Sequence, residues 1–199
     1  MKAIIATLLL FPILSSHVLA QSDIGFGIKA GMNLSSQKVV GEGTNVNTKT
    51  LAGFHIGGYC NYFILEPLGI QAELLVSQKG SKWSDPYFSG KDRLCYIDIP
   101  ILIRYQALEF LNVHAGPQFG FLMKAKQIPD DGDKMDAKEY YKGTDIGLAF
   151  GVQGNLPHNV NVTLRYILGL SNITTEVEYW EGWKNNVFQI SVGYRFNGK

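Results

Sequence analysis

The chain has 199 residues and almost no net charge, with 18 basic and 17 acidic side chains. Its hydrophobic fraction of 46% excludes general disorder, and the lack of a basic stripe argues against a nucleic-acid partner. After residue 20, no stretch of about 18 residues is both apolar and uncharged, which excludes membrane-spanning helices. These limits leave a one-domain protein whose hydrophobic residues must be interpreted by their periodicity.

The first 20 residues have the pattern of a secretory signal peptide. Lys2 gives a basic start, residues 3–14 form an uncharged apolar run, and residues 15–20 end in small side chains. The apolar run is shorter than the roughly 20 residues that a spanning helix needs. We therefore expect cleavage between Ala20 and Gln21, and one exported domain over residues 21–199.

The mature chain contains eight segments in which every second residue is apolar. The clearest is 95–105, and the others lie near 24–33, 53–63, 69–77, 113–121, 145–153, 160–169 and 188–196. Each has about the 9–11 residues that a tilted strand needs to cross a bilayer. The apolar parity carries no charge, whereas residues such as Glu73 and Arg165 lie on the opposite parity. Because Lys or Arg on a lipid-facing position costs roughly 2–4 kcal/mol, the polar parity is predicted to line a lumen.

The connections between these segments alternate in length. Long connections are expected at 34–51, 80–93, 124–144 and 171–186, and short ones at 65–68, 107–111 and 155–159. Outer-membrane barrels have short periplasmic turns and longer outer loops. The pattern predicts an all-β protein, an eight-stranded antiparallel up-and-down transmembrane β-barrel, with both termini on the periplasmic side.

Three segments also resemble a known family. They are Gly27–Asn33, Tyr96–Tyr105 and His114–Pro117, and they look like the PorT-type or "porin family" outer-membrane barrel domain of Bacteroidetes, a small OmpA-like barrel. The ending Val192–Phe196 resembles the aromatic signal read by the barrel-assembly machinery. The resemblance implies a bacterial outer-membrane location and contact with lipid and lipopolysaccharide, and it offers a role as a component of a secretion system as an alternative.

Charged residues on the polar parity are the candidate site of the lumen. They either form a paired network, because side chains nearly fill an eight-stranded barrel, or they bind a polar ligand or line a conducting path. The candidate residues are Glu73, Asp98, Arg104, Arg165 and Arg195.

No pattern indicates catalysis, a metal or a cofactor. His55 and His114 have lumen parity on strands that are not consecutive, and no spacing joins a nucleophile to an oriented base. We therefore expect a protein that is not an enzyme, with a lipid-modifying enzyme as an alternative. Cys60 and Cys95 are predicted to be free, lipid-facing thiols, because strand 69–77 lies between them.

Aromatic residues in the long connections are candidate contact residues for a partner protein, lipopolysaccharide or the membrane interface. The main ones are Trp83, Tyr140, Trp180 and Trp183. The expected role is structural, interacting or weakly pore-forming in the cell envelope. A soluble lipocalin-like carrier is a further alternative, but its apolar face would point inward.

Overall fold

The computed structural model describes residues 24–41, 44–84, 89–130, 132–175 and 180–196. Eight strands are long, namely β1 (Ile24–Gly41), β3 (Lys49–Leu65), β4 (Leu68–Ser84), β5 (Ser89–Leu108), β6 (Leu111–Pro129), β8 (Thr144–Asn155), β9 (Val160–Gly169) and β10 (Trp180–Arg195). The short elements are β2 (Thr44–Asn47), β7 (Met135–Asp136) and the 3-10 helix η1 (Lys138–Tyr140). In the described part of the chain, no helix has the length and apolar character to cross a membrane.

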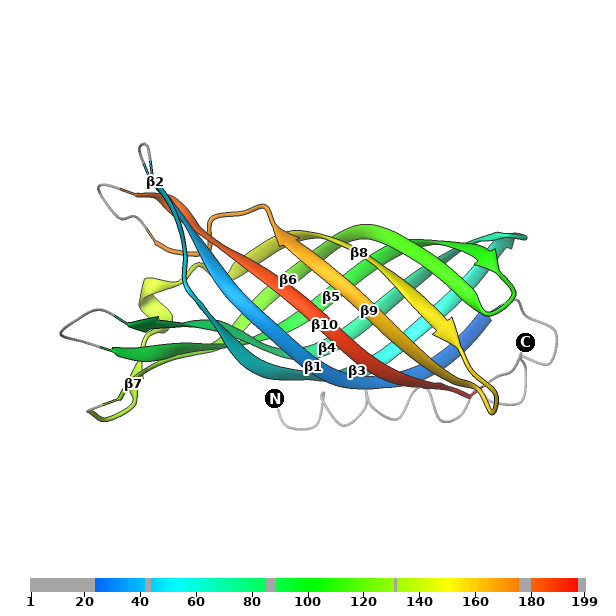
Figure 1. Cartoon of the computed structure of the whole chain (residues 1–199), viewed down its shortest axis with the longest axis horizontal. Coiled ribbons are helices and arrows are strands. Elements are labelled where there is room, and N and C mark those ends of the chain that lie inside the picture. Colours follow the sequence, from blue (N-terminus) through cyan, green and yellow to red (C-terminus); the bar gives the residue numbers. More distant parts are fainter. Residues whose placement is uncertain (1–23, 42–43, 85–88, 131, 176–179, 197–199) are drawn as a thin grey trace, which may run out of the picture.

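The eight long strands form one closed sheet (Figure 1). Each pairs antiparallel with the next in the order β1, β3, β4, β5, β6, β8, β9 and β10. The ring closes where β10 pairs with β1, from Gly27 opposite Arg195 to Gly41 opposite Trp180. A closed ring satisfies backbone hydrogen bonds without the help of water, as a membrane requires. The predicted eight-stranded up-and-down barrel is confirmed.

The two ends of the barrel differ. At the end where β1 begins and β10 finishes, short turns at 66–67, 109–110 and 156–159 join the strands. We call this the turn end, and it is the right-hand end in Figure 1. The opposite loop end carries β2, β7, η1 and the longer connections. The predicted alternation of short and long connections holds except between β4 and β5, which only residues 85–88 separate.

The strands extend further toward the loop end than the sequence pattern indicates. Loops are predicted at 34–51, 80–93 and 124–144, but β1 continues to Gly41 and β6 to Pro129, and β4 pairs with β5 as far as Ser84 opposite Ser89. Outside the bilayer no lipid requires an apolar face, so the ladder continues through polar sequence without alternation. The predicted loop boundaries are wrong at this end, although the number and order of the strands are right.

Apolar side chains point outward and polar side chains inward along the strands. Leu164 and Ile190 are 42% and 43% exposed, whereas Glu73 and Arg165 are only 3% and 2% exposed. The outward set includes Ile28, Met32, Phe54, Ile56, Leu74, Val76, Ile103, Phe121, Leu148, Phe150 and Val192. A lipocalin-like carrier has the reverse arrangement, so that alternative is wrong.

Glycines allow large lumen side chains to lie against the barrel wall. A Cβ atom on Gly27 would come within 2.3 Å of the Tyr59 ring and 2.5 Å of the Tyr194 carbonyl oxygen. A Cβ atom on Gly31 would come within 2.8 Å of the His55 ring. The absence of a side chain at these positions of β1 therefore sets where Tyr59 and His55 can lie.

Candidate functional site

A buried carboxylate, Glu73 on β4, joins three strands across the lumen. Arg165 on β9 donates two hydrogen bonds to it, at 2.8 Å and 2.7 Å, and Lys29 on β1 donates a third at 2.9 Å. Arg165 Nε also donates to His114 Nε2 at 3.1 Å. We call Lys29, Glu73, His114 and Arg165 the Glu73 cluster. It holds two cations and one anion, so its formal charge is +1 with neutral histidine.

A second charged group, which we call the Lys79 cluster, has the opposite balance. Lys79 on β4 donates to Asp98 Oδ1 at 2.9 Å and to Asp145 Oδ2 at 3.1 Å. Asn185 on β10 donates to the same Asp145 oxygen at 3.1 Å, and the Lys79 ammonium lies 4.7 Å from the centre of the Tyr96 ring. One cation and two anions give this cluster a formal charge of −1.

Neutral polar side chains form a further connected group. His55 Nδ1 lies 2.7 Å from Asn33 Oδ1, and His55 Nε2 lies 2.9 Å from Ser191 Oγ. Serine, histidine and asparagine in this order have the connectivity of a nucleophile, a base and an orienting group. All three are at most 3% exposed, inside the barrel wall and away from lipid. A lipid-modifying enzyme needs these atoms to reach its substrate, so we interpret the group as structural.

Apolar residues pack together at the loop end of the barrel. Ala137 and Ile173, from the connections before β8 and before β10, pack against side chains of β5 and β6, with Tyr141 and Trp183 beside them. We call this the loop-end cap, and its strand residues are Leu94, Tyr96, Leu122 and Ala125. Backbone hydrogen bonds from Lys142 to Ile173 (2.7 Å) and from Ile173 to Trp183 (2.9 Å) fix the two connections together. Burial, followed by the charge of Asp92, raises the pKa of the Tyr141 hydroxyl.

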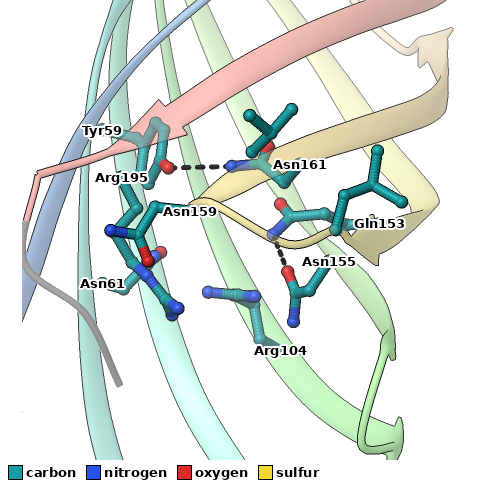
Figure 2. A pocket seen from close by; sticks show the side chains of 10 residues that line it. Tyr59, Asn61, Arg104, Gln153, Asn155, Asn159, Asn161 and Arg195 are labelled. Atoms are coloured by element: carbon teal, nitrogen blue, oxygen red, sulfur yellow. Dashed lines mark hydrogen bonds between the residues drawn. The ribbon is translucent and has the colours of Figure 1, made fainter.

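A small pocket of about 20 Å³ lies at the turn end (Figure 2). It includes the predicted site residues Arg104 and Arg195, and its other polar lining residues are Tyr59, Asn61, Gln153, Asn155, Asn159 and Asn161. Asn161 Nδ2 donates to the Tyr59 hydroxyl at 3.0 Å, and Gln153 Nε2 donates to Asn155 Oδ1 at 3.1 Å. We call this site the turn-end pocket.

The structure divides the five predicted lumen residues among three places. Glu73 and Arg165 pair directly, Asp98 belongs to the Lys79 cluster, and Arg104 and Arg195 share the turn-end pocket. Sequence reasoning did not include Lys29, Lys79 or Asp145 among the site residues. Lys29 and Asp145 lie at the polar positions of their strands, so the alternation could have identified them as lumen residues. Lys79 lies at the same alternate positions of its strand as Glu73 and Ser77.

The four predicted contact aromatics lie in different environments. Tyr140 is 60% exposed, and Trp83 is half-buried, with its ring close to Gly90. Trp183 is half-buried against the loop-end cap instead of forming part of an open surface. The side chain of Trp180 lies outside the described residues.

Cys60 and Cys95 are free thiols of intermediate burial, and their contact with lipid stays a prediction. Among the residues that the structure describes, no three His, Cys, Asp or Glu side chains are placed to hold a metal ion. The predicted signal peptide, residues 1–20, lies outside the described residues.

A closed eight-stranded ring with an apolar outer face, a charged and packed interior, and short turns at one end defines a small outer-membrane β-barrel. Residues 19–175 match the family model described as "Outer membrane protein beta-barrel domain", and the chain belongs to this family. It is a protein of the bacterial outer membrane, where its apolar face contacts lipid.

Three solved structures similar to this chain are two of Ail and one of Neisserial surface protein A. Ail, the attachment invasion locus protein of Yersinia pestis, is 17% identical with a TM-score of 0.51, over 86% of this chain and 98% of that chain. The same protein in complex with the heparin analogue sucrose octasulfate is 18% identical with a TM-score of 0.50, over 86% and 99%. Neisserial surface protein A is 14% identical with a TM-score of 0.49, over 86% and 97%. No curated protein sequence matches this chain.

Proposed function

We propose that this barrel does not conduct, and that it acts as a structural and interaction protein of the outer membrane. The observation that carries the proposal is the ion pairing in the lumen. The side chains of Lys29, Glu73, Lys79 and Arg165 are each at most 1% exposed. A solute path through the barrel would need these contacts to open, at the cost of separating buried charges.

Planar-bilayer recording on the refolded mature chain tests this proposal. The expected result is a current no larger than that of a protein-free bilayer, because the clusters and the loop-end cap occupy the lumen. A porin recorded in the same bilayers is the positive control. Discrete current steps from the unmodified barrel would contradict the proposal.

The interaction surface is proposed to lie at the loop end, on the part of the barrel outside the bilayer. Among the predicted contact aromatics whose side chains the structure describes, Tyr140 is the most exposed, and it lies in η1 at this end. Lipopolysaccharide and an envelope protein are the two candidate partners. Binding of the Tyr140→Ala variant to lipopolysaccharide vesicles, compared with that of the Phe110→Ala variant at the turn end, tests the first candidate. Equal binding by both variants would show that Tyr140 does not belong to the interaction surface.

Export and insertion are proposed to use the two ends of the chain. Cleavage after residue 20 predicts that the mature protein begins at Gln21 and consists of one domain over residues 21–199, which N-terminal sequencing checks. At the other end, Tyr194 and Phe196 are outward-facing, 46% and 55% exposed, with ring centres 5.9 Å apart. Phe196→Ala should slow insertion by the barrel-assembly machinery, whereas Phe110→Ala, an aromatic residue of a turn, should not.

A more specific candidate is a PorT-like component of a protein secretion system in a Bacteroidetes envelope. Its support is the resemblance of Gly27–Asn33 and Tyr96–Tyr105, which form parts of β1 and β5 in the barrel wall. Deletion of the gene followed by an assay of secreted proteins tests it. Unchanged secretion would contradict this candidate and leave only the general envelope role.

A further inference from the structure

The turn-end pocket holds two cations that have no acidic partner among the described residues. Between described residues, the ion pairs of the lumen are those of the Glu73 and Lys79 clusters. Arg104 is 4% exposed, and its Nε has no hydrogen-bond partner in the described structure; the buried Nε of Arg195 also has none. Figure 2 shows both side chains directed into the same space. Two unpaired, partly desolvated cations at one place are costly without an anion.

The lining of the pocket supplies polar groups but no negative charge. The described lining residues include four asparagines and a glutamine and no Asp or Glu. Asn61 and Asn161 are each 3% exposed, and the Oδ1 atom of each lacks a donor among the described residues. The site therefore offers N–H donors that suit an anion together with carbonyl acceptors that suit a hydroxyl group.

We propose that the turn-end pocket binds a hydrogen-phosphate group that enters from the periplasmic end. The guanidinium groups of Arg104 and Arg195 donate charge-assisted hydrogen bonds to the phosphate oxygens. The P–OH group donates to Asn61 Oδ1 or Asn161 Oδ1, which a fully deprotonated sulfate cannot do. A cavity of about 20 Å³ has room for one oxygen-sized group, so the remaining oxygens lie toward the turns. The group belongs to free phosphate or to a lipid headgroup, which share this chemistry.

Ordered water is the competing occupant, because it also satisfies buried donors and acceptors. The two occupants differ in how stability responds to anions. A ligand that binds the folded state alone raises the unfolding temperature in proportion to the logarithm of its concentration, whereas water does not depend on added phosphate.

The experiment uses the refolded mature chain in phosphate-free micelles. Calorimetric binding and thermal unfolding are followed with inorganic phosphate, glycerol phosphate, sulfate and chloride at equal ionic strength. Phosphate is expected to bind and to raise the unfolding temperature, with weaker binding of sulfate and none of chloride. Arg104→Gln and Arg195→Gln should each weaken phosphate binding about tenfold or more, since hydrogen bonds to charged groups are lost. Arg93→Gln, at an exposed position of the same strand as Arg104, should bind like the unmodified chain.

The arms of the experiment distinguish the sources of the ligand. Binding of inorganic phosphate supports a free ion, and binding of glycerol phosphate alone supports a lipid headgroup. Binding of neither, or equal effects of chloride, shows water only and overturns the proposal. If Arg104→Gln does not fold, Arg104→Lys retains the charge but loses the planar donors, and undiminished phosphate binding by that variant would also overturn it.

Discussion

Glu73 on β4 and Arg165 on β9 meet across the lumen through two hydrogen bonds, although 92 positions separate them in the chain. Lys29 on β1 donates to the same carboxylate. Three strands from different parts of the ring are thus joined at one anion. Because that anion balances two cations, its loss leaves more uncompensated charge than the loss of either cation.

Glu73→Gln should therefore destabilise the barrel by about 3–5 kcal/mol, the usual cost of breaking a buried ion pair. Arg165→Gln should cost less, because Lys29 still balances Glu73. The double variant Glu73→Gln with Arg165→Gln should be more stable than Glu73→Gln alone, since one lone cation remains instead of two. Urea unfolding in lipid vesicles, followed by heat-modifiable gel mobility, measures the order of stability of these variants.

Glu66→Gln is the matched control for this series, because Glu66 is an exposed carboxylate in a short turn. Its effect should stay within about 0.5 kcal/mol, as for other surface substitutions. An equal loss for Glu73→Gln and for the double variant would show that the two charges do not act together.

In the Lys79 cluster, loss of the cation is expected to destabilise the barrel more than loss of an anion. Lys79→Met leaves Asp98 and Asp145 buried without a cation, so it should destabilise by about 3–5 kcal/mol. Asp145→Asn removes the surplus anion and should cost much less. Lys82→Met, at an exposed lysine of the same strand, is the control and should change the urea midpoint little. A larger loss for Asp145→Asn than for Lys79→Met would contradict the charge count.

The direction of these side chains could be predicted from the sequence, but their partners could not. A period of two determines on which side of the sheet Glu73 and Asp98 lie, because one residue of displacement would place a charge against lipid. Which residues then meet depends on the tilt and stagger of all eight strands. Glu73 reaches Arg165 instead of Arg104 because of that stagger, and no local pattern encodes it.

The loop end shows the second limit of sequence reasoning. Alternation stops at Gln78 to Ser84 because no lipid selects for it there, yet β4 remains paired with β5 through this segment. Trp183 is predicted to be a contact residue of a long connection, and instead it packs against the cluster that contains Ala137 and Ile173. Packing of this kind depends on contacts between two connections that lie far apart in the sequence.

The lipid face gives a direct test of the membrane assignment. Leu164 lies in the middle of β9, faces outward and is 42% exposed. Leu164→Arg should cost roughly 2–4 kcal/mol, the cost of a cation near the bilayer midplane. Leu108→Arg, at the turn end of β5, should cost about 0–1 kcal/mol, since it lies near the interface. Equal urea midpoints for the two variants in vesicles would contradict the placement of the bilayer.

The loop-end cap gives the last prediction. The side chain of Ile173 is fully buried among residues of β5 and β6, and its backbone accepts from Lys142 and donates to Trp183. Ile173→Ala removes buried apolar volume, so it should destabilise the cap by about 2–5 kcal/mol.

The cap is held mainly by loops, whereas the clusters below it are held by the barrel wall. Loss of the cap should therefore appear as faster protease cleavage between β6 and β8, while heat-modifiable mobility is unchanged. Met135→Ala, at a half-exposed position of the connection between β6 and β8, is the control and should be cleaved at the rate of the unmodified chain. Equal cleavage of all three proteins would show that Ile173 does not hold the two connections together.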